Sequence, residues 1–225
     1  MRIFRGIADV RSSASHAVRF RSKRFRFFRE LVEPLQRAKR GPLSLLDVGG
    51  TENYWRTMGF LDCGIEFTIL NLDPFQPTHA AVKSAVGDAR EMKEYGDQSF
   101  DVVYSNSVIE HVGDLSDQCR MADEIRRIAR NYFVQTPNYW FPLEPHFLTP
   151  GFQWLPLSAR AWLIQKTSLG HLDRVPDPHD ALELVKSFRL LDQREMCSLF
   201  PDGSVWRERV AGLTKSITLY RFNSS

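Results

Sequence analysis

Short apolar runs that stop at glycine or at polar turn-forming residues constrain the fold of this chain more than any other feature. Runs of this kind are typical of strands that are buried on both faces of a parallel sheet. They lie at 43–48, 67–72, 81–86, 100–104 and 132–135. Apolar residues at helical spacing precede the first run, at 24–40, and separate the last two, at 114–129. The alternation predicts an α/β fold with a doubly wound, mostly parallel sheet and right-handed crossovers.

The length of 225 residues favours one sizeable core, so we expect a single domain over 41–225. Segment 139–157 is rich in proline and aromatic residues, and helical patterns follow it near 159–166 and 180–187. Because this segment leaves the fifth run at the end of the sheet where ligands bind, we expect 139–175 to form a lid over the substrate.

Residues 1–40 form a basic, amphipathic segment in which twelve Lys and Arg face three acidic residues. Three interpretations stay open: a solvated helical face over a buried Phe stripe, a docking surface for an anionic acceptor or membrane, and a transit peptide. The sequence contains no apolar stretch of about 18 residues, so we expect no membrane span. The charge alone gives little reason to expect nucleic acid as a partner. Scattered Cys63, Cys119 and Cys197 fit a reducing cytoplasm.

Three of the runs end in residues that suit a nucleotide-like ligand. In parallel sheets of this kind, ligands bind beyond the carboxyl ends of the strands. Glycines after the first run, in Asp47-Val48-Gly49-Gly50, let backbone NH groups approach a ligand closely. Asp73 after the second run is placed to accept hydrogen bonds from ribose hydroxyls. Asp88 in Gly87-Asp88-Ala89 is placed to accept from an adenine amine. Each could alone be a turn or a cap, but together they mark one crevice.

These motifs resemble the successive binding motifs of class I S-adenosylmethionine-dependent methyltransferases. The most specific part is Ser99-Phe100-Asp101-Val102-Val103-Tyr104-Ser105-Asn106-Ser107-Val108-Ile109-Glu110-His111-Val112, which looks like the fourth-strand signature of the methyltransferase type 11 group. The resemblance implies a Rossmann-like sheet of seven strands, the last antiparallel, with helices on both faces. It also implies S-adenosyl-L-methionine as methyl donor.

The resemblance further implies roles for individual residues. Gly49 and Gly50 would lie beside the methionine part of the donor, Asp73 on its ribose and Asp88 near its adenine. The other cofactor-binding residues expected from these motifs are Asp47, Ala89 and Asn106. The family's usual D-x-G-x-G-x-G loop is shortened here, so Thr51, Glu52 or Asn53 would replace its later glycines.

Methyl transfer depends mainly on alignment of acceptor and donor, and a hydroxyl acceptor also needs a base. His146 is the first candidate, because it follows Glu144 in a loop whose prolines restrict the backbone. The alternative is a structural loop whose histidine only binds a carbonyl. His111, after Glu110, is the second candidate. We expect Tyr139, Trp140 and Phe141 to line the acceptor site.

We expect no metal ion. Some metal-using relatives carry a Glu-x-x-Glu-His arrangement on the helix after the fourth strand. Here the first position of that arrangement is Ser107, so the set of ligands looks incomplete.

The sequence therefore predicts an enzyme that methylates a small molecule, with O-methylation of a sugar, glycolipid or cell-envelope polysaccharide precursor favoured. One alternative is an N- or C-methyltransferase of a secondary metabolite. Another is a module that binds S-adenosylmethionine, or an interaction partner, without turnover. A nicotinamide dehydrogenase is disfavoured because G-x-G-x-x-G is absent from the sequence. A nucleic-acid methyltransferase is disfavoured because no Asn-Pro-Pro-Tyr tetrad follows the fourth run.

Overall fold

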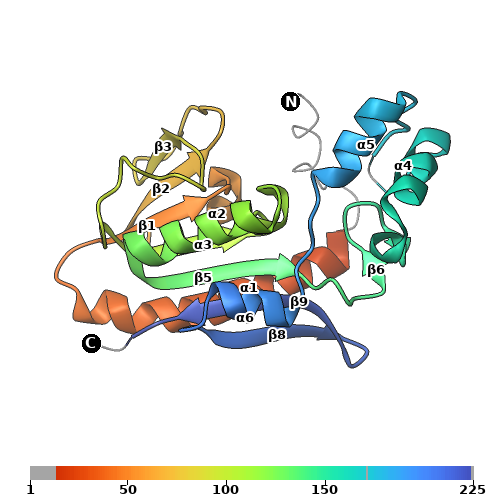
Figure 1. The fold of residues 1–225 in the computed structure, drawn as a ribbon. Helices are drawn as coiled ribbons and strands as arrows, with labels where there is room; N and C mark the ends of the chain where they lie inside the picture. The colour runs from red at the N-terminus through yellow and green to blue at the C-terminus, as the bar shows by residue number, and fades with distance from the viewer. Residues whose placement is uncertain (1–13, 171, 224–225) are drawn as a thin grey trace.

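A seven-stranded sheet forms the centre of the computed structural model, which describes residues 14–170 and 172–223 (Figure 1). The strand order is β3-β2-β1-β4-β5-β9-β8. Strands β1 to β5 are parallel, and β9 runs antiparallel to both of its neighbours. The strands are β1 (Leu43–Val48), β2 (Ile65–Asn71), β3 (Val82–Val86), β4 (Phe100–Asn106), β5 (Ala129–Pro137), β8 (Ser204–Val210) and β9 (Leu213–Arg221). The predicted fold class, with an antiparallel last strand, is confirmed.

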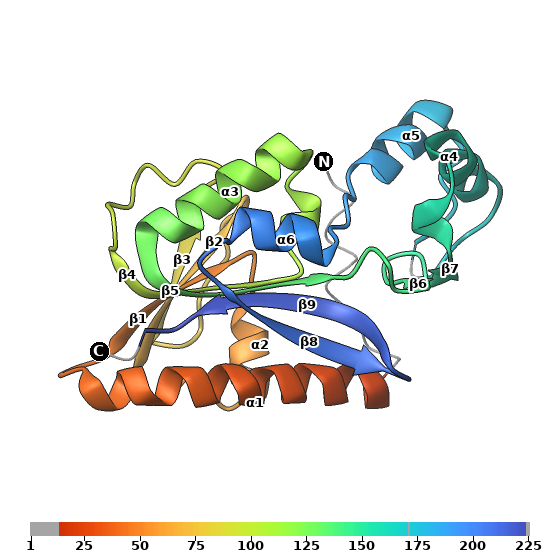
Figure 2. The same cartoon turned by 60° about the horizontal axis from the view of Figure 1, so that its bottom comes forward.

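Helices cover both faces of the sheet (Figure 2). On one face α3 (Leu115–Ile128) and α6 (Gln193–Leu199) pack over β4, β5 and β9. On the other face lie α1 (Ala14–Ala38) and α2 (Glu52–Thr57). The central strands are therefore buried on both sides, which explains their continuous apolar sequence.

Helix α1 is longer than the sequence pattern predicted, because it begins at Ala14 and not near residue 24. Its buried side chains Phe25, Phe28 and Val32 recur at helical spacing and share one hydrophobic cluster with β1 and β2. Between Ala14 and Lys23 the only large apolar residues in the sequence are Val18 and Phe20, so the helical period is weak there. The expected boundary at residue 40 therefore marks only the end of the basic segment. The hydrophobic cluster continues from α1 into the sheet.

A small subdomain is inserted between β5 and α6 and lies beyond the carboxyl end of β5 (Figure 1). It has its own hydrophobic cluster, which extends from Phe147 to Phe188. The lid expected over 139–175 therefore continues through α5 in its packing. Its elements are β6 (Leu143–Glu144), β7 (Thr149–Pro150), η3 (Phe152–Trp154), α4 (Leu157–Lys166) and α5 (Pro178–Lys186). Among the described helices, none combines the length and apolar character needed to cross a membrane.

The packing of α1 generates a stability prediction. The side chain of Phe28 is fully buried, and its ring contacts those of Tyr104 and Phe133, at centroid distances of 4.8 and 5.3 Å. We expect Phe28→Ala to lower the free energy of unfolding by about 3–5 kcal/mol, because it leaves a cavity between helix and sheet. Urea unfolding measures this. The exposed neighbour Arg26→Ala is the control, with an expected change within about 0.5 kcal/mol. An equally small effect of Phe28→Ala would show that α1 does not pack on the sheet.

Candidate functional site

The turn after β1 is tight and built around a buried carboxyl. The Asp47 side chain accepts a hydrogen bond from the indole Nε1 of Trp55 at 2.7 Å through Oδ2, while its Oδ1 has no hydrogen-bond partner in the described part of the chain. Burial raises the pKa of Asp47 to about 7, although the bond from Trp55 opposes that rise. A Cβ on Gly50 would lie 1.6 Å from Asp47 Oδ2, so only glycine fits there. This position needs close approach of the backbone, as the sequence suggested.

The shortened loop leads directly into α2. Thr51 is the N-cap of this helix and its hydroxyl accepts from the backbone NH of Tyr54. The Glu52 carboxylate accepts from the backbone NH of Thr78 at 2.8 Å and is also bound by Arg56. Two of the three side chains expected to replace the missing glycines therefore have structural contacts. Asn53 remains beside them in the first turn of the helix.

The acidic residues after β2 and β3 lie in different environments. Asp73 is exposed directly after β2, whose last residue Asn71 donates a side-chain hydrogen bond to the Gly50 carbonyl at 3.1 Å. Asp88 forms a bidentate ion pair with Arg90, in which Nε and Nη2 of Arg90 donate to its two oxygens at 2.9 and 2.6 Å. The Arg90 guanidinium thereby lowers the pKa of Asp88. Ala89 is buried in the cluster beneath α3.

Asn106 contacts the buried side chain of Arg24, a contact that no pattern in the sequence predicts. Nη1 of Arg24 donates to the Asn106 side-chain oxygen and to Oε1 of Gln135, the latter at 2.7 Å. Nη2 of Arg24 is paired with Glu208 at 2.5 Å. The Ser107 hydroxyl also donates to Gln135. The end of β4 is thus tied to α1, β5 and β8.

The structure brings together the three residues predicted to carry acid/base chemistry. His146 Nδ1 lies 2.6 Å from Oε1 of Glu144, and Oε2 of Glu144 accepts from the backbone NH groups of His146 and Phe147, both at 2.7 Å. The His111 ring contacts the His146 ring at a centroid distance of 4.9 Å. Phe188 packs against both imidazoles. The β6–β7 hairpin therefore places His146 against the helical turn Ile109–His111, which follows β4.

Electrostatics gives these groups different protonation states. Burial, together with the charge of His146, lowers the pKa of His111 to about 3. For His146, burial opposes the charged form, but the hydrogen bond and charge of Glu144, with the charge of Glu110, outweigh it and raise the pKa. Burial raises the pKa of Glu110 to about 7. His111 is hence a neutral imidazole at physiological pH, whereas the raised pKa of His146 favours its protonated form.

Glu110, His111 and His146 also offer ligand atoms that lie within 4.8 Å of one another. Glu110 Oε2 accepts from the Thr136 hydroxyl at 3.0 Å. Imidazole and carboxylate groups are ligands of divalent transition metals, so these three residues could hold such an ion. The sequence-based prediction of no metal ion depended on Ser107. It did not include His146, which approaches Glu110 and His111 from the lid.

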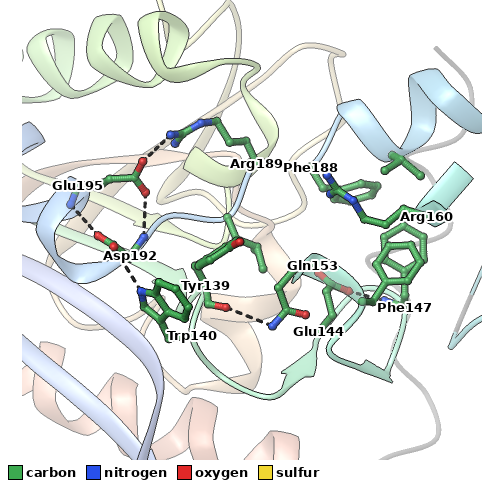
Figure 3. A pocket seen from close by; sticks show the side chains of 13 residues that line it. Tyr139, Trp140, Glu144, Phe147, Gln153, Arg160, Phe188, Arg189, Asp192 and Glu195 are labelled. Carbon is green, nitrogen blue, oxygen red and sulfur yellow. Dashed lines mark hydrogen bonds and ion pairs between the residues drawn. The ribbon is translucent and has the colours of Figure 1, made fainter. Parts of the chain in front are cut away.

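A pocket of about 360 Å³ lies between the small subdomain and the segment that leads from it into α6 (Figure 3). Of the three residues expected to line the acceptor site, Tyr139 and Trp140 line this pocket and Phe141 does not. The Trp140 indole donates to Asp192 at 3.3 Å. The remaining lining residues are Glu144, Phe147, Phe152, Gln153, Arg160, Val185, Phe188, Arg189, Leu190 and Glu195. Glu144 belongs to both this pocket and the histidine pair, so the two features are adjacent.

Comparison with known proteins adds sequence and fold matches. Residues 56–132 match the type 11 family described as a methyltransferase domain. An uncharacterized protein of Mycobacterium tuberculosis is 33% identical over 82 residues, which are 36% of this chain and 28% of that protein. The chain thus spans less than a third of the length of that relative.

Solved structures share the fold at low sequence identity. A SAM-dependent methyltransferase from Methanosarcina mazei matches with a TM-score of 0.51 and 12% identity, over 83% of this chain and 94% of that one. The 1,6-didemethyltoxoflavin-N1-methyltransferase of Burkholderia thailandensis, solved with 1,6-didemethyltoxoflavin and S-adenosylhomocysteine, matches with a TM-score of 0.50 and 15% identity, over 93% and 80%. The methyltransferase-domain match covers residues 56–132 of the 225, and the solved structures show that the chain shares the fold of S-adenosylmethionine-dependent methyltransferases.

Proposed function

We propose that this protein transfers a methyl group from S-adenosyl-L-methionine to a hydroxyl of a small acceptor, with a sugar, glycolipid or cell-envelope polysaccharide precursor favoured. The observation that carries the proposal is the Glu144–His146 pair, which borders an aromatic pocket beside the carboxyl ends of the strands. Free thiols at Cys63, Cys119 and Cys197 support a cytoplasmic site of action. The basic segment at 1–40 supports contact with an anionic acceptor or membrane, although residues 1–13 lie outside the described part of the chain.

The turn after β1 fits the methionine part of this donor. When bound, S-adenosylmethionine supplies an electrophilic methyl group on a sulfonium. The unpaired, buried Oδ1 of Asp47 offers an acceptor to an ammonium group, and the absence of a side chain at Gly50 lets the Asp47 carboxyl lie directly against the turn. Gly49 has a positive φ of 74° and brings the turn close to Val108, after β4. Asp73, exposed at the end of β2, would hold the ribose, with Asp88, Ala89 and Asn106 along the rest of the crevice.

The lid would supply the base. Glu144 holds Nδ1 of His146, which leaves Nε2 to accept the proton of the acceptor hydroxyl. Glu144 is buried and also binds two backbone NH groups, so it fixes the orientation of the imidazole as the hairpin folds. His111, neutral and in ring contact, would position His146 from the other side.

Calorimetric titration tests the donor site. We expect S-adenosylmethionine and S-adenosylhomocysteine to bind at micromolar concentration, and Asp73→Ala to weaken binding ten-fold or more, which is about 1.4 kcal/mol. Asp73 is exposed, so its loss should leave the fold intact. The equally exposed Asp62→Ala is the matched control, and NAD should not bind. Absence of binding would contradict the donor assignment. Binding without turnover on a panel of sugar precursors would favour the non-catalytic module.

Kinetics test the base. We expect His146→Ala to lower kcat by about 10²–10⁴-fold without changing the affinity for S-adenosylhomocysteine. The wild-type rate should rise with pH through a value above 6.5, because His146 must lose its proton and its pKa is raised. Glu144→Gln should move that inflection downward, because it removes the charge that favours protonated His146. The exposed His179→Ala is the control. An unchanged pH profile in Glu144→Gln would rule out His146 as the base.

Removal of metal ions by a chelator tests whether His146 acts as a base or as a metal ligand. Because Ser107 replaces the first glutamate of the metal-binding arrangement, we expect full activity after dialysis against EDTA, and no gain with added Mg²⁺ or Mn²⁺. Loss of activity that Mn²⁺ restores would instead assign Glu110, His111 and His146 to a metal centre.

A further inference from the structure

The pocket beside the lid contains one cation without a partner. The Arg160 guanidinium, on α4, forms no hydrogen bond or ion pair with any residue that the structure describes, and its Nε is buried. The other arginine of the pocket is already neutralised, because Arg189 pairs with Glu195 and donates to Gln118 at 2.6 Å. Arg160 lies against the aromatic wall of the pocket near Phe188 (Figure 3).

The carboxylates of the pocket are occupied elsewhere. Glu144 is held by His146 and by two backbone NH groups. Asp192 and Glu195 form the capping box of α6, and Asp192 also accepts from Trp140. None of these anions pairs with Arg160, so its positive charge is available to a ligand. Burial lowers the pKa of Arg160, the charges of Tyr139 and Glu144 oppose this shift only in part, and a bound anionic ligand would oppose it further.

A second polar group of the same wall lacks a partner. The Gln153 side chain is 7% exposed, and its Nε2 donates to the carbonyls of Tyr139 and Phe141 at 3.1 and 2.6 Å. These two bonds fix the amide, so that Oε1 is an acceptor without a donor among the described residues. A buried acceptor in this state is unfavourable, and a hydroxyl of a ligand would satisfy it.

The volume of the pocket and its lining residues limit the kind of ligand that it can bind. A volume of about 360 Å³ lies at the small end of ligand pockets and suits a molecule the size of one sugar ring. Tyr139, Phe147 and Phe188 give the ring an apolar wall. An arginine fork binds carboxylate or phosphate oxygens in a bidentate manner, more strongly where water is excluded.

We propose that the acceptor is a hydroxylated ring of monosaccharide size that carries one anionic group, a carboxylate or a phosphate ester, and that Arg160 binds this group. The inference rests on the proposed function, because it makes this pocket the acceptor site. It adds the charge of the substrate and the residue that selects it.

Binding experiments with the full chain test this without turnover. Glucose is compared with glucuronate and glucose 6-phosphate by calorimetry and tryptophan fluorescence, with and without S-adenosylhomocysteine. We expect at least one anionic sugar to bind ten-fold or more tightly than glucose. The carboxylate and phosphate arms show which group the pocket takes.

Variants assign the effect to Arg160. We expect Arg160→Met to remove the preference for the anion while keeping the affinity for glucose, and Arg160→Lys to retain part of it. Arg174→Met is the matched control, since Arg174 is an exposed arginine of the same subdomain. Thermal unfolding of each variant shows whether the lid is intact.

The outcomes separate this inference from the donor assignment. Equal affinity for glucose and both anions, failure of all three sugars to bind, or an unchanged preference in Arg160→Met would overturn the inference. Such a result beside tight S-adenosylhomocysteine binding would leave the donor site standing. A preference that depends on Arg160 in a protein that does not bind S-adenosylhomocysteine would support the anion site and overturn the methyl donor.

Discussion

Arg24 is buried beneath the carboxyl ends of the central strands, and its guanidinium joins four parts of the chain. It binds Asn106 of β4, Gln135 of β5 and Glu208 of β8 from its position on α1. A buried charge of this kind needs a charged partner, and removal of that partner typically costs about 3–5 kcal/mol. The edge of the sheet where the ligand is expected therefore depends on α1 being docked.

The lid depends on a second arrangement of the same kind, at smaller scale. The buried Glu144 carboxylate binds the imidazole of His146 and two backbone NH groups of its own hairpin. The hairpin cannot fold without setting the orientation of the histidine. Its contact with His111 and Phe188 then couples the lid to the turn after β4. Glu144 thus both orients the His146 imidazole and raises its pKa.

The turn after β1 shows how a shortened glycine loop remains compatible with a ligand. Two glycines suffice because α2 begins immediately after Thr51, and Trp55 of that helix binds the Asp47 carboxyl. The indole satisfies one carboxyl oxygen and leaves the other unpaired. The tight turn therefore retains an unpaired carboxyl oxygen, packed directly against Gly50.

Local patterns in the sequence determined the parallel sheet, the strand ends and the proximity of Glu144 to His146, because each depends on neighbouring residues. The sequence pattern did not predict strand β8, because Arg207, Glu208 and Arg209 interrupt its apolar residues. Only the tertiary structure showed that Glu208 is buried, because its partner Arg24 lies 184 positions earlier. The same holds for Arg160, whose unpaired state depends on which carboxylates other elements have already bound. A sequence records the charges of its residues, but their pairing is decided by the distances that folding creates.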